Sequence, residues 1–160
     1  MKKNLETPVL QFLQKMVDGS LKENENTFFQ YPTAISKLLK FNVVEVDQGH
    51  SKISVDADAK IHGNQQGTVH GGFISELADA AIGTAHSTLI AKGESFTSLE
   101  LKINFFRPVW KNTLLAHCYP IQSGKTITVY QCDISKDDGK LVAKATSTVM
   151  TLRGEQAQGR

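Results

Sequence analysis

The stretch FISELADAAIGTAHSTLIA, residues 73–91, decides the fold. It contains no proline, and its apolar or small residues fall on nearly every side of a helix instead of on one stripe. A helix of this kind is normally buried on all sides. Its many small side chains would also let strands pack closely against it. We therefore expect residues 73–91 to form one long central helix, with the rest of the chain around it.

Six strand-like runs flank this helix. Two precede it and four follow it, at residues 41–46, 53–57, 95–106, 114–122, 126–135 and 141–152. Short turns join successive runs, which indicates antiparallel pairing and an α+β fold. The expected architecture is a curved antiparallel sheet wrapped around one helix. Such a sheet has two edges, and pairing one edge with a second copy of the chain would protect it.

The two ends of the chain differ from this central part. Apolar residues at helical spacing predict a helix over residues 8–21, capped by Thr7, and a second short helix is expected over residues 33–39. The residues after the last strand are polar and should fray. The expected division is an N-terminal helical extension, a main domain and a polar tail, at residues 1–30, 31–152 and 153–160.

Composition excludes several classes of protein. A net charge of +2, with the basic residues scattered along the chain, predicts no nucleic-acid partner. No stretch approaches the ~20 apolar residues of a membrane helix, and the N-terminal segment lacks the unbroken apolar core of an export signal. Cys118 and Cys132 fall in strand-like runs and are interpreted as small buried side chains, not as a disulfide. We therefore expect a cytoplasmic protein without a membrane partner.

Residues that carry chemistry gather around the start of the central helix. Glu76 and Asp79 lie three residues apart on one broad face, and a buried carboxylate is costly unless it is paired. Each is a satisfied buried acid, an acid that reaches the helix flank and solvent, or a functional group. Just upstream, a backbone N–H of Gly71 or Gly72 would lie at the positive end of the helix dipole, where it could polarise an acyl carbonyl. The alternative is a glycine-permitted turn capped by His70.

The run NQQGTVHGGFISELAD, residues 64–79, resembles the hotdog-fold acyl-CoA thioesterases of the phenylacetate-pathway (PaaI-like) type and of the human thioesterase superfamily member 2 type. The resemblance continues through SLELKINFFRPV, residues 98–109, and the turn Gly124-Lys125-Thr126. It covers most of the chain, from Thr33 to Leu152. It implies a hotdog fold, hydrolysis of an acyl-CoA thioester, and a homodimer or a tetramer of two dimers.

Carried over by position, the resemblance implies four catalytic residues. Asp79 would act as the general base for water or as a nucleophile, and the Gly71 N–H would hold the thioester oxygen. Asn64 would face the acid from the partner subunit, and Ser98 would orient the water. Glu76 has no counterpart in the family pattern and is interpreted as structural or as part of the rim.

Further residues would surround the substrate. The resemblance gives His70 a mainly architectural place beside the substrate, next to Gly72. Arg107 and Lys125 are the basic residues expected to meet the phosphates of CoA. No spacing predicts a metal site, and no separate cofactor is expected, because CoA is part of the substrate. His62, close to Asn64 in sequence, is expected to be exposed.

Two other functions stand beside hydrolysis. They are a hotdog hydratase or dehydratase, and a non-catalytic module that binds or senses acyl-CoA. The acyl group, aromatic or aliphatic, and the choice between CoA and a carrier protein stay open. His86, on the central helix, is expected to be a hydrogen-bonded core residue, and the helix over residues 8–21 is a candidate cover for part of the acyl pocket.

Overall fold

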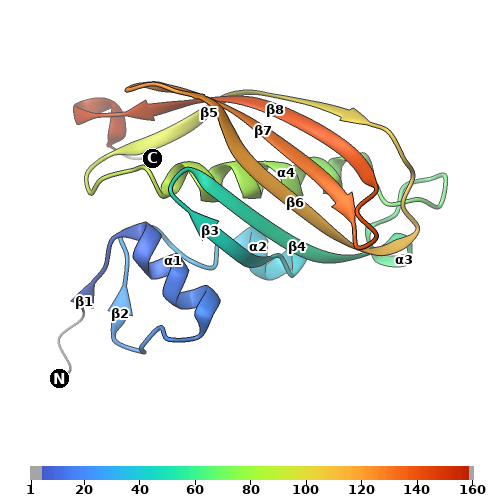
Figure 1. Cartoon of the computed structure of the whole chain (residues 1–160), viewed down its shortest axis with the longest axis horizontal. Helices are drawn as coiled ribbons and strands as arrows, with labels where there is room; N and C mark the ends of the chain where they lie inside the picture. Colours follow the sequence, from blue (N-terminus) through green and yellow to red (C-terminus); the bar gives the residue numbers. More distant parts are fainter. Residues whose placement is uncertain (1–4, 159–160) are drawn as a thin grey trace.

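Helix α4 (Gly71–Ser87) packs against a six-stranded sheet, in the computed structural model that describes residues 5–158 (Figure 1). The strands run in the order β3-β4-β6-β7-β8-β5, and every neighbouring pair is antiparallel. Their bounds are β3 (Asn42–Asp47), β4 (His50–Asp58), β5 (Ser95–Phe105), β6 (Lys111–Ser123), β7 (Ile127–Lys136) and β8 (Leu141–Leu152). This arrangement confirms the predicted α+β hotdog architecture.

The face of α4 that meets the sheet is made of small and branched apolar residues. Those that are fully buried include Leu77, Ala78, Ala81, Ile82 and Ala85. The sheet contributes the fully buried alanines Ala116, Ala143 and Ala145 to the same cluster. Because alanines on both surfaces leave little side chain between the backbones, the helix can lie close to the strands. Full burial of each leucine or isoleucine contributes about 1.5–3 kcal/mol.

The opposite face of α4 is only partly buried by the described residues. Residues at helical spacing along it are only half-buried, and we call them the outer stripe: Ser75, Glu76, Asp79, Ala80 and Gly83. The prediction of a helix buried on every side is therefore wrong for this stripe. The physical reason is that a cavity, and not a layer of side chains, lies over it.

Several element boundaries differ from the sequence prediction. The central helix begins at Gly71, because His70 caps it, and it ends at Ser87 instead of continuing to residue 91. Pro8, without a side-chain cap bond, takes the N-cap place expected for Thr7. Four short elements were not predicted: the strands β1 (Leu5–Glu6) and β2 (Glu25–Asn26), the helix α3 (Ala59–His62) and the 3₁₀ helix η1 (Gly154–Ala157). The prediction of a fully frayed tail is thus wrong up to Ala157.

The N-terminal part forms a separate small lobe beside β3 (Figure 1). It contains α1 (Val9–Asp18) and the short parallel strands β1 (Leu5–Glu6) and β2 (Glu25–Asn26), followed by α2 (Ala34–Leu39). A second apolar cluster joins α1 to the sheet through the buried residues Val9, Phe12, Leu13 and Val46. This lobe therefore covers the sheet at its β3 edge. The β5 edge has no such cover within residues 5–158.

The two cysteines and His86 are core residues. Cys118 and Cys132 are opposite each other on β6 and β7, and both are free and fully buried, as predicted. His86 is also buried, with its two ring nitrogens 3.0 Å from the hydroxyl oxygens of Tyr130 and Thr151. Burial lowers the pKa of His86 to about 4, so the ring is neutral at pH 7. The prediction of a hydrogen-bonded core histidine is confirmed.

Candidate functional site

The start of α4 is organised by its N-cap residue, His70. The Gly72 N–H donates to His70 Nδ1 over 2.8 Å, and a Cβ at Gly72 would lie only 2.9 Å from that nitrogen. Glycine is thus needed at position 72 for this cap, and its N–H is not available to a substrate. The N–H of Gly71 has no hydrogen-bond partner among residues 5–158. This N–H lies at the positive end of the helix dipole, so it can donate a hydrogen bond to a substrate.

The loop before α4 is held by Asn64. Its Oδ1 accepts from the N–H groups of Gln66 and Thr68, at 2.9 and 3.2 Å. Its Nδ2 donates to Thr68 Oγ1 at 3.0 Å. Asn64 and Gly71 line one cavity of about 360 Å³, which Phe105, Phe106 and other residues close. The structure therefore brings Asn64 and Gly71 together, with Asn64 fixing the loop that leads to the Gly71 N–H.

Asp79 lies in the outer stripe of α4, half-buried at the wall of a different cavity. We call this the Asp79 cavity; it measures about 410 Å³. Burial raises the pKa of the Asp79 carboxyl, and the nearby Ser98 hydroxyl partly offsets the increase. The structure thus brings Asp79 and Ser98 together. A carboxylate with a raised pKa in a cavity is a candidate acid or base for catalysis.

A β-bulge interrupts β5 directly after Ser98. The register between β5 and β8 shifts between Ser98 and Glu100, so Leu99 is the extra residue. Phe96 before the bulge and Leu101 and Ile103 after it all pack against the core. Ser98 is two residues from Phe96 and shares its helix-facing side. Bulges are common next to functional sites, and here the extra residue lets Ser98 before it and Leu101 after it lie on the same side of β5.

Glu76 lies in the same cavity as Asp79. It is half-buried and three residues earlier on α4, and burial, together with the charge of Asp79, raises the pKa of its carboxyl. Sequence reasoning placed Glu76 in a structural role or at the rim, because the family pattern has no acid there. Its i, i+3 spacing from Asp79 was the signal that both acids share one surface.

The Asp79 cavity has a third wall that sequence reasoning missed. Its walls come from the outer stripe of α4, from the start of β5, and from residues 29–36, which contribute Phe29, Tyr31 and Ile35. The helix expected to cover the acyl pocket, α1, packs against β3 and is not part of this wall. Phe28, Phe29 and Tyr31 are aromatic residues in an otherwise polar linker. They were the feature of the sequence from which this wall could have been inferred.

The two halves of the predicted site are apart within one chain. Asn64 and Gly71 line one cavity, whereas Asp79 lines the other. Eight residues separate Gly71 from Asp79 along α4, which is about 12 Å of helix. A single acyl carbonyl cannot contact the N–H and the carboxylate of the same chain across this distance. The predicted catalytic residues therefore form two pairs in one chain.

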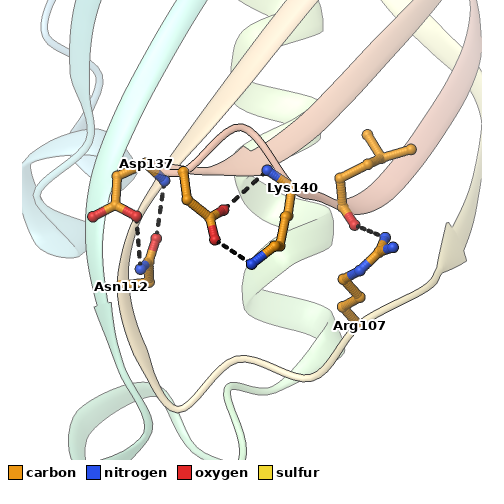
Figure 2. Close-up of polar contacts among 6 residues, drawn as sticks. Arg107, Asn112, Asp137 and Lys140 are labelled. Carbon is orange, nitrogen blue, oxygen red and sulfur yellow. Dashed lines mark hydrogen bonds and ion pairs between the residues drawn. The ribbon is translucent and has the colours of Figure 1, made fainter.

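The two basic residues predicted to meet CoA phosphates lie at opposite ends of β8. Arg107 follows β5, is exposed, and donates from its guanidinium to the Leu141 carbonyl at 2.6 Å (Figure 2). Figure 2 also shows the neighbouring turn, where Asn112 and Asp137 bond each other. Lys125 lies in the exposed turn between β6 and β7, next to the far end of β8, since Thr151 bonds to Thr126. One chain does not bring these two cations together.

His62 does not behave as predicted. Its ring stacks on Phe73, with centroids 4.0 Å apart, and its Nδ1 accepts from the Asp58 N–H. The prediction of an exposed loop histidine is wrong, because the four-residue helix α3 places it against the core. Among residues 5–158, no three His, Cys, Asp or Glu side chains form a group that could hold a metal ion. No helix in the same range is long and apolar enough to cross a membrane.

Comparison with known proteins agrees with this geometry. The family model described as "Thioesterase superfamily" matches residues 66–143. A protein of Saccharolobus solfataricus, which its name assigns provisionally to the esterases, is 30% identical over 143 residues, or 82% of this chain and 93% of the relative. A variant of the phenylacetic acid degradation protein PaaI of Thermus thermophilus has a similar structure, with TM-score 0.68 and 26% identity over 74% of this chain and 98% of that one. The PaaI protein of E. coli shares the fold over 94% of this chain and 96% of its own, with TM-score 0.71 and 23% identity.

Proposed function

The chain belongs to the thioesterase superfamily, and we propose that it hydrolyses acyl-CoA thioesters to a carboxylic acid and free CoA. The observation that carries this proposal is the pairing of Asp79 with Ser98 at the wall of a cavity. The helix that presents Asp79 also begins at Gly71, whose N–H has no acceptor within residues 5–158. A base and an oxyanion donor are the two groups that water attack on a thioester needs.

Asp79 acts as the general base in this proposal. Its carboxylate takes a proton from water while the water oxygen bonds to the thioester carbonyl carbon. Ser98, whose hydroxyl lies near Asp79, orients that water. The negative charge that develops on the carbonyl oxygen is stabilised by the Gly71 N–H. When the tetrahedral intermediate collapses, the C–S bond breaks, sulfur leaves with the electron pair, and the proton on Asp79 passes to the CoA thiolate.

The two pairs of residues meet if two chains join through β5. Ser98 lies near the start of this strand, and Phe105 lies at its end, where its ring packs over Gly71. Antiparallel pairing of two β5 strands puts the start of one beside the end of the other. Asp79 and Ser98 of one subunit would then face Asn64 and Gly71 of the partner subunit.

Strand β5 is suited to such pairing. It has 11 residues and, within residues 5–158, bonds only to β8, whereas the other edge strand, β3, has 6 residues and is covered by α1. Large apolar side chains are exposed along and just after β5, at Leu99, Phe105 and Phe106. A long uncovered edge with exposed apolar residues is a common protein interface. The proposed assembly is a homodimer, or a tetramer of two such dimers.

The same pairing gives Arg107 and Lys125 a shared place. In one chain they lie about 30 Å apart, at the two ends of β8. In the dimer, Arg107 of one subunit would approach the β6–β7 turn of the partner, which contains Lys125. Both side chains would bind CoA phosphates there. We place the reaction in the cytoplasm, since the two buried cysteines are free thiols.

The test combines thiol release with subunit mixing. Thiol release from a panel of acyl-CoAs is measured for the wild type, for Asp79→Asn, for Asn64→Ala, and for the two variants refolded together. Each variant alone should be nearly inactive. A mixed dimer contains one site with both Asp79 and Asn64 intact, so random mixing should restore about a quarter of the wild-type sites.

The outcomes separate the parts of the proposal. No thiol release from any acyl-CoA by the wild type overturns hydrolysis and leaves an acyl-CoA-binding module. Hydrolysis by the wild type without recovery on mixing overturns the two-chain site. Water addition to an enoyl-CoA double bond, followed by its absorbance, would instead indicate a hydratase.

A further inference from the structure

The Asp79 cavity is built partly from sequence outside the family match. The matched region is residues 66–143, whereas one wall of the cavity is formed by residues 29–36. We propose that Phe29, in this wall, sets the maximum length of the acyl group that the cavity accepts. This inference rests on the proposed function, since it assigns the Asp79 cavity to the acyl part of the substrate.

Phe29 lies across the cavity from the central helix. Its ring is edge-on to that of Phe96, with centroids 5.8 Å apart and planes at 87°. Phe96 in turn approaches Gly83, where a Cβ would lie 3.9 Å from its ring. The two rings thus join the residue 29–36 wall to α4. Gly83 is four residues beyond Asp79, about 6 Å farther along the helix. The ring pair therefore stands about one helical turn past the reacting carboxylate, where the far end of an acyl group would reach.

The wall that carries Phe29 is held in place from behind. The ring centroids of Phe28 and Phe29 lie 4.8 Å apart. Both rings belong to the apolar cluster around Phe12 and Leu13 of α1. On the other side, Tyr31 donates a hydrogen bond of 2.5 Å to Ser87 on α4. The wall is thus bonded to α4 and packed on α1. Because close-packed side chains resist displacement, Phe29 forms a steric stop.

The lining of this cavity suits an uncharged chain. None of the described residues that line it is Lys or Arg, so the phosphates of CoA have no partner here. Around the ring pair the lining is apolar or small, with Phe29, Tyr31, Phe96, Ala80 and Gly83. The two acids, Glu76 and Asp79, lie at the end nearer the start of α4. This polarity fits a thioester at the acidic end and the acyl group beside the rings.

Binding of non-hydrolysable analogues tests the stop directly. The probes are S-alkyl-CoA thioethers from butyl to hexadecyl, and calorimetry gives the affinity of each. Each methylene that enters the cavity should improve affinity about fourfold. For the wild type the gain should cease at one chain length. For Phe29→Ala that limit should move to longer chains by at least two methylenes, and for Phe29→Leu by less.

Phe28→Ala is the matched control. It removes the same ring from the same cluster, but Phe28 does not line the cavity. Thermal unfolding of both alanine variants reports the shared loss of packing. Because Phe28 supports the wall only from behind, the length limit of Phe28→Ala should move less than that of Phe29→Ala. An unchanged limit in Phe29→Ala and Phe29→Leu, or an equal move in Phe28→Ala, overturns the inference.

Parallel thiol-release measurements keep this inference separate from the proposed function. Thioethers that bind with a Phe29-dependent limit, without hydrolysis of the matching acyl-CoAs, would overturn hydrolysis and leave the stop in place. Hydrolysis with a length profile that Phe29→Ala does not change would overturn the stop alone.

Discussion

Replacement of Asp79 by asparagine separates the charge of this side chain from its shape. Asparagine fills nearly the same volume in the outer stripe of α4 and can still bond to Ser98. It cannot accept a proton from water at neutral pH. The variant therefore removes the general base and leaves the cavity, the Gly71 N–H and the β5 edge unchanged.

The size of the expected effect follows from this geometry. General-base assistance is typically worth about 10²–10⁴-fold, so kcat of Asp79→Asn should fall at least ~100-fold. Glu76→Gln is the matched control, because it removes a carboxylate from the same cavity three residues away. Glu76 has no hydrogen bond to Ser98 among the described contacts, and we expect its loss to cost far less.

Thiol release under saturating acyl-CoA measures both variants, with dimer content and circular dichroism as checks on assembly and fold. Near-wild-type turnover by Asp79→Asn together with an inactive Glu76→Gln would show that the wrong acid was chosen. Full activity in both variants would remove the carboxylate mechanism altogether. In the wild type the activity should fall as pH decreases through the raised pKa of Asp79.

The same substitution should stabilise the fold. Burial raises the folded-state pKa of Asp79 above its unfolded value, so the folded protein binds the proton more tightly than the unfolded chain. The ionised carboxylate is therefore destabilising above the folded pKa, and this cost disappears as pH falls below the unfolded pKa of about 4. Asp79→Asn should raise Tm at pH 7, with a smaller gain at pH 3. A lower Tm at pH 7 would contradict the assigned burial cost.

Three further predictions follow from the structure. Arg107→Ala and Lys125→Ala should raise KM with kcat near wild type, the sign of lost uniform binding, whereas a large kcat loss at unchanged KM would place them at the chemistry. Gly72→Ala should break the His70 cap, since its Cβ would lie 2.9 Å from Nδ1, and should cost about 0.5–2 kcal/mol in urea denaturation; unchanged stability would contradict the cap. Leu99→Asp on the β5 edge should shift the protein to monomer in light scattering and abolish thiol release together, and an active monomer would refute the dimer.

The sequence was sufficient for the architecture because the buried parts follow simple periodicities. Alternating apolar residues marked β8 at its observed limits, Leu141–Leu152, and small apolar residues marked α4. The predicted ends of α4 were less accurate. The start of the helix depends on the hydrogen bond from the Gly72 N–H to the His70 ring. A side-chain to backbone bond of this kind is not visible in hydrophobic periodicity.

The candidate site could be predicted only in part. The family resemblance pointed to Asp79 and Ser98, and the structure places their side chains near each other. The same resemblance gave no role to Glu76 and could not find Phe29, because the cavity wall joins residues 29–36 to α4 across more than 40 positions of sequence. The β-bulge at Leu99, which changes the side of β5 that the following residues face, also could not be predicted from the alternation.

The places where local rules fail in this chain lie along one side of the molecule. Two acids with raised pKa values stand in the outer stripe of α4, where a helix of this composition would normally be buried. Strand β5, which borders the same cavity, has an outer edge that none of the described strands pairs with, and it exposes Leu99 and Phe105. Each feature alone lowers the stability of a monomer. A second chain on β5 would cover the apolar residues and bring a Gly71 N–H to the acids, so one contact would account for both departures.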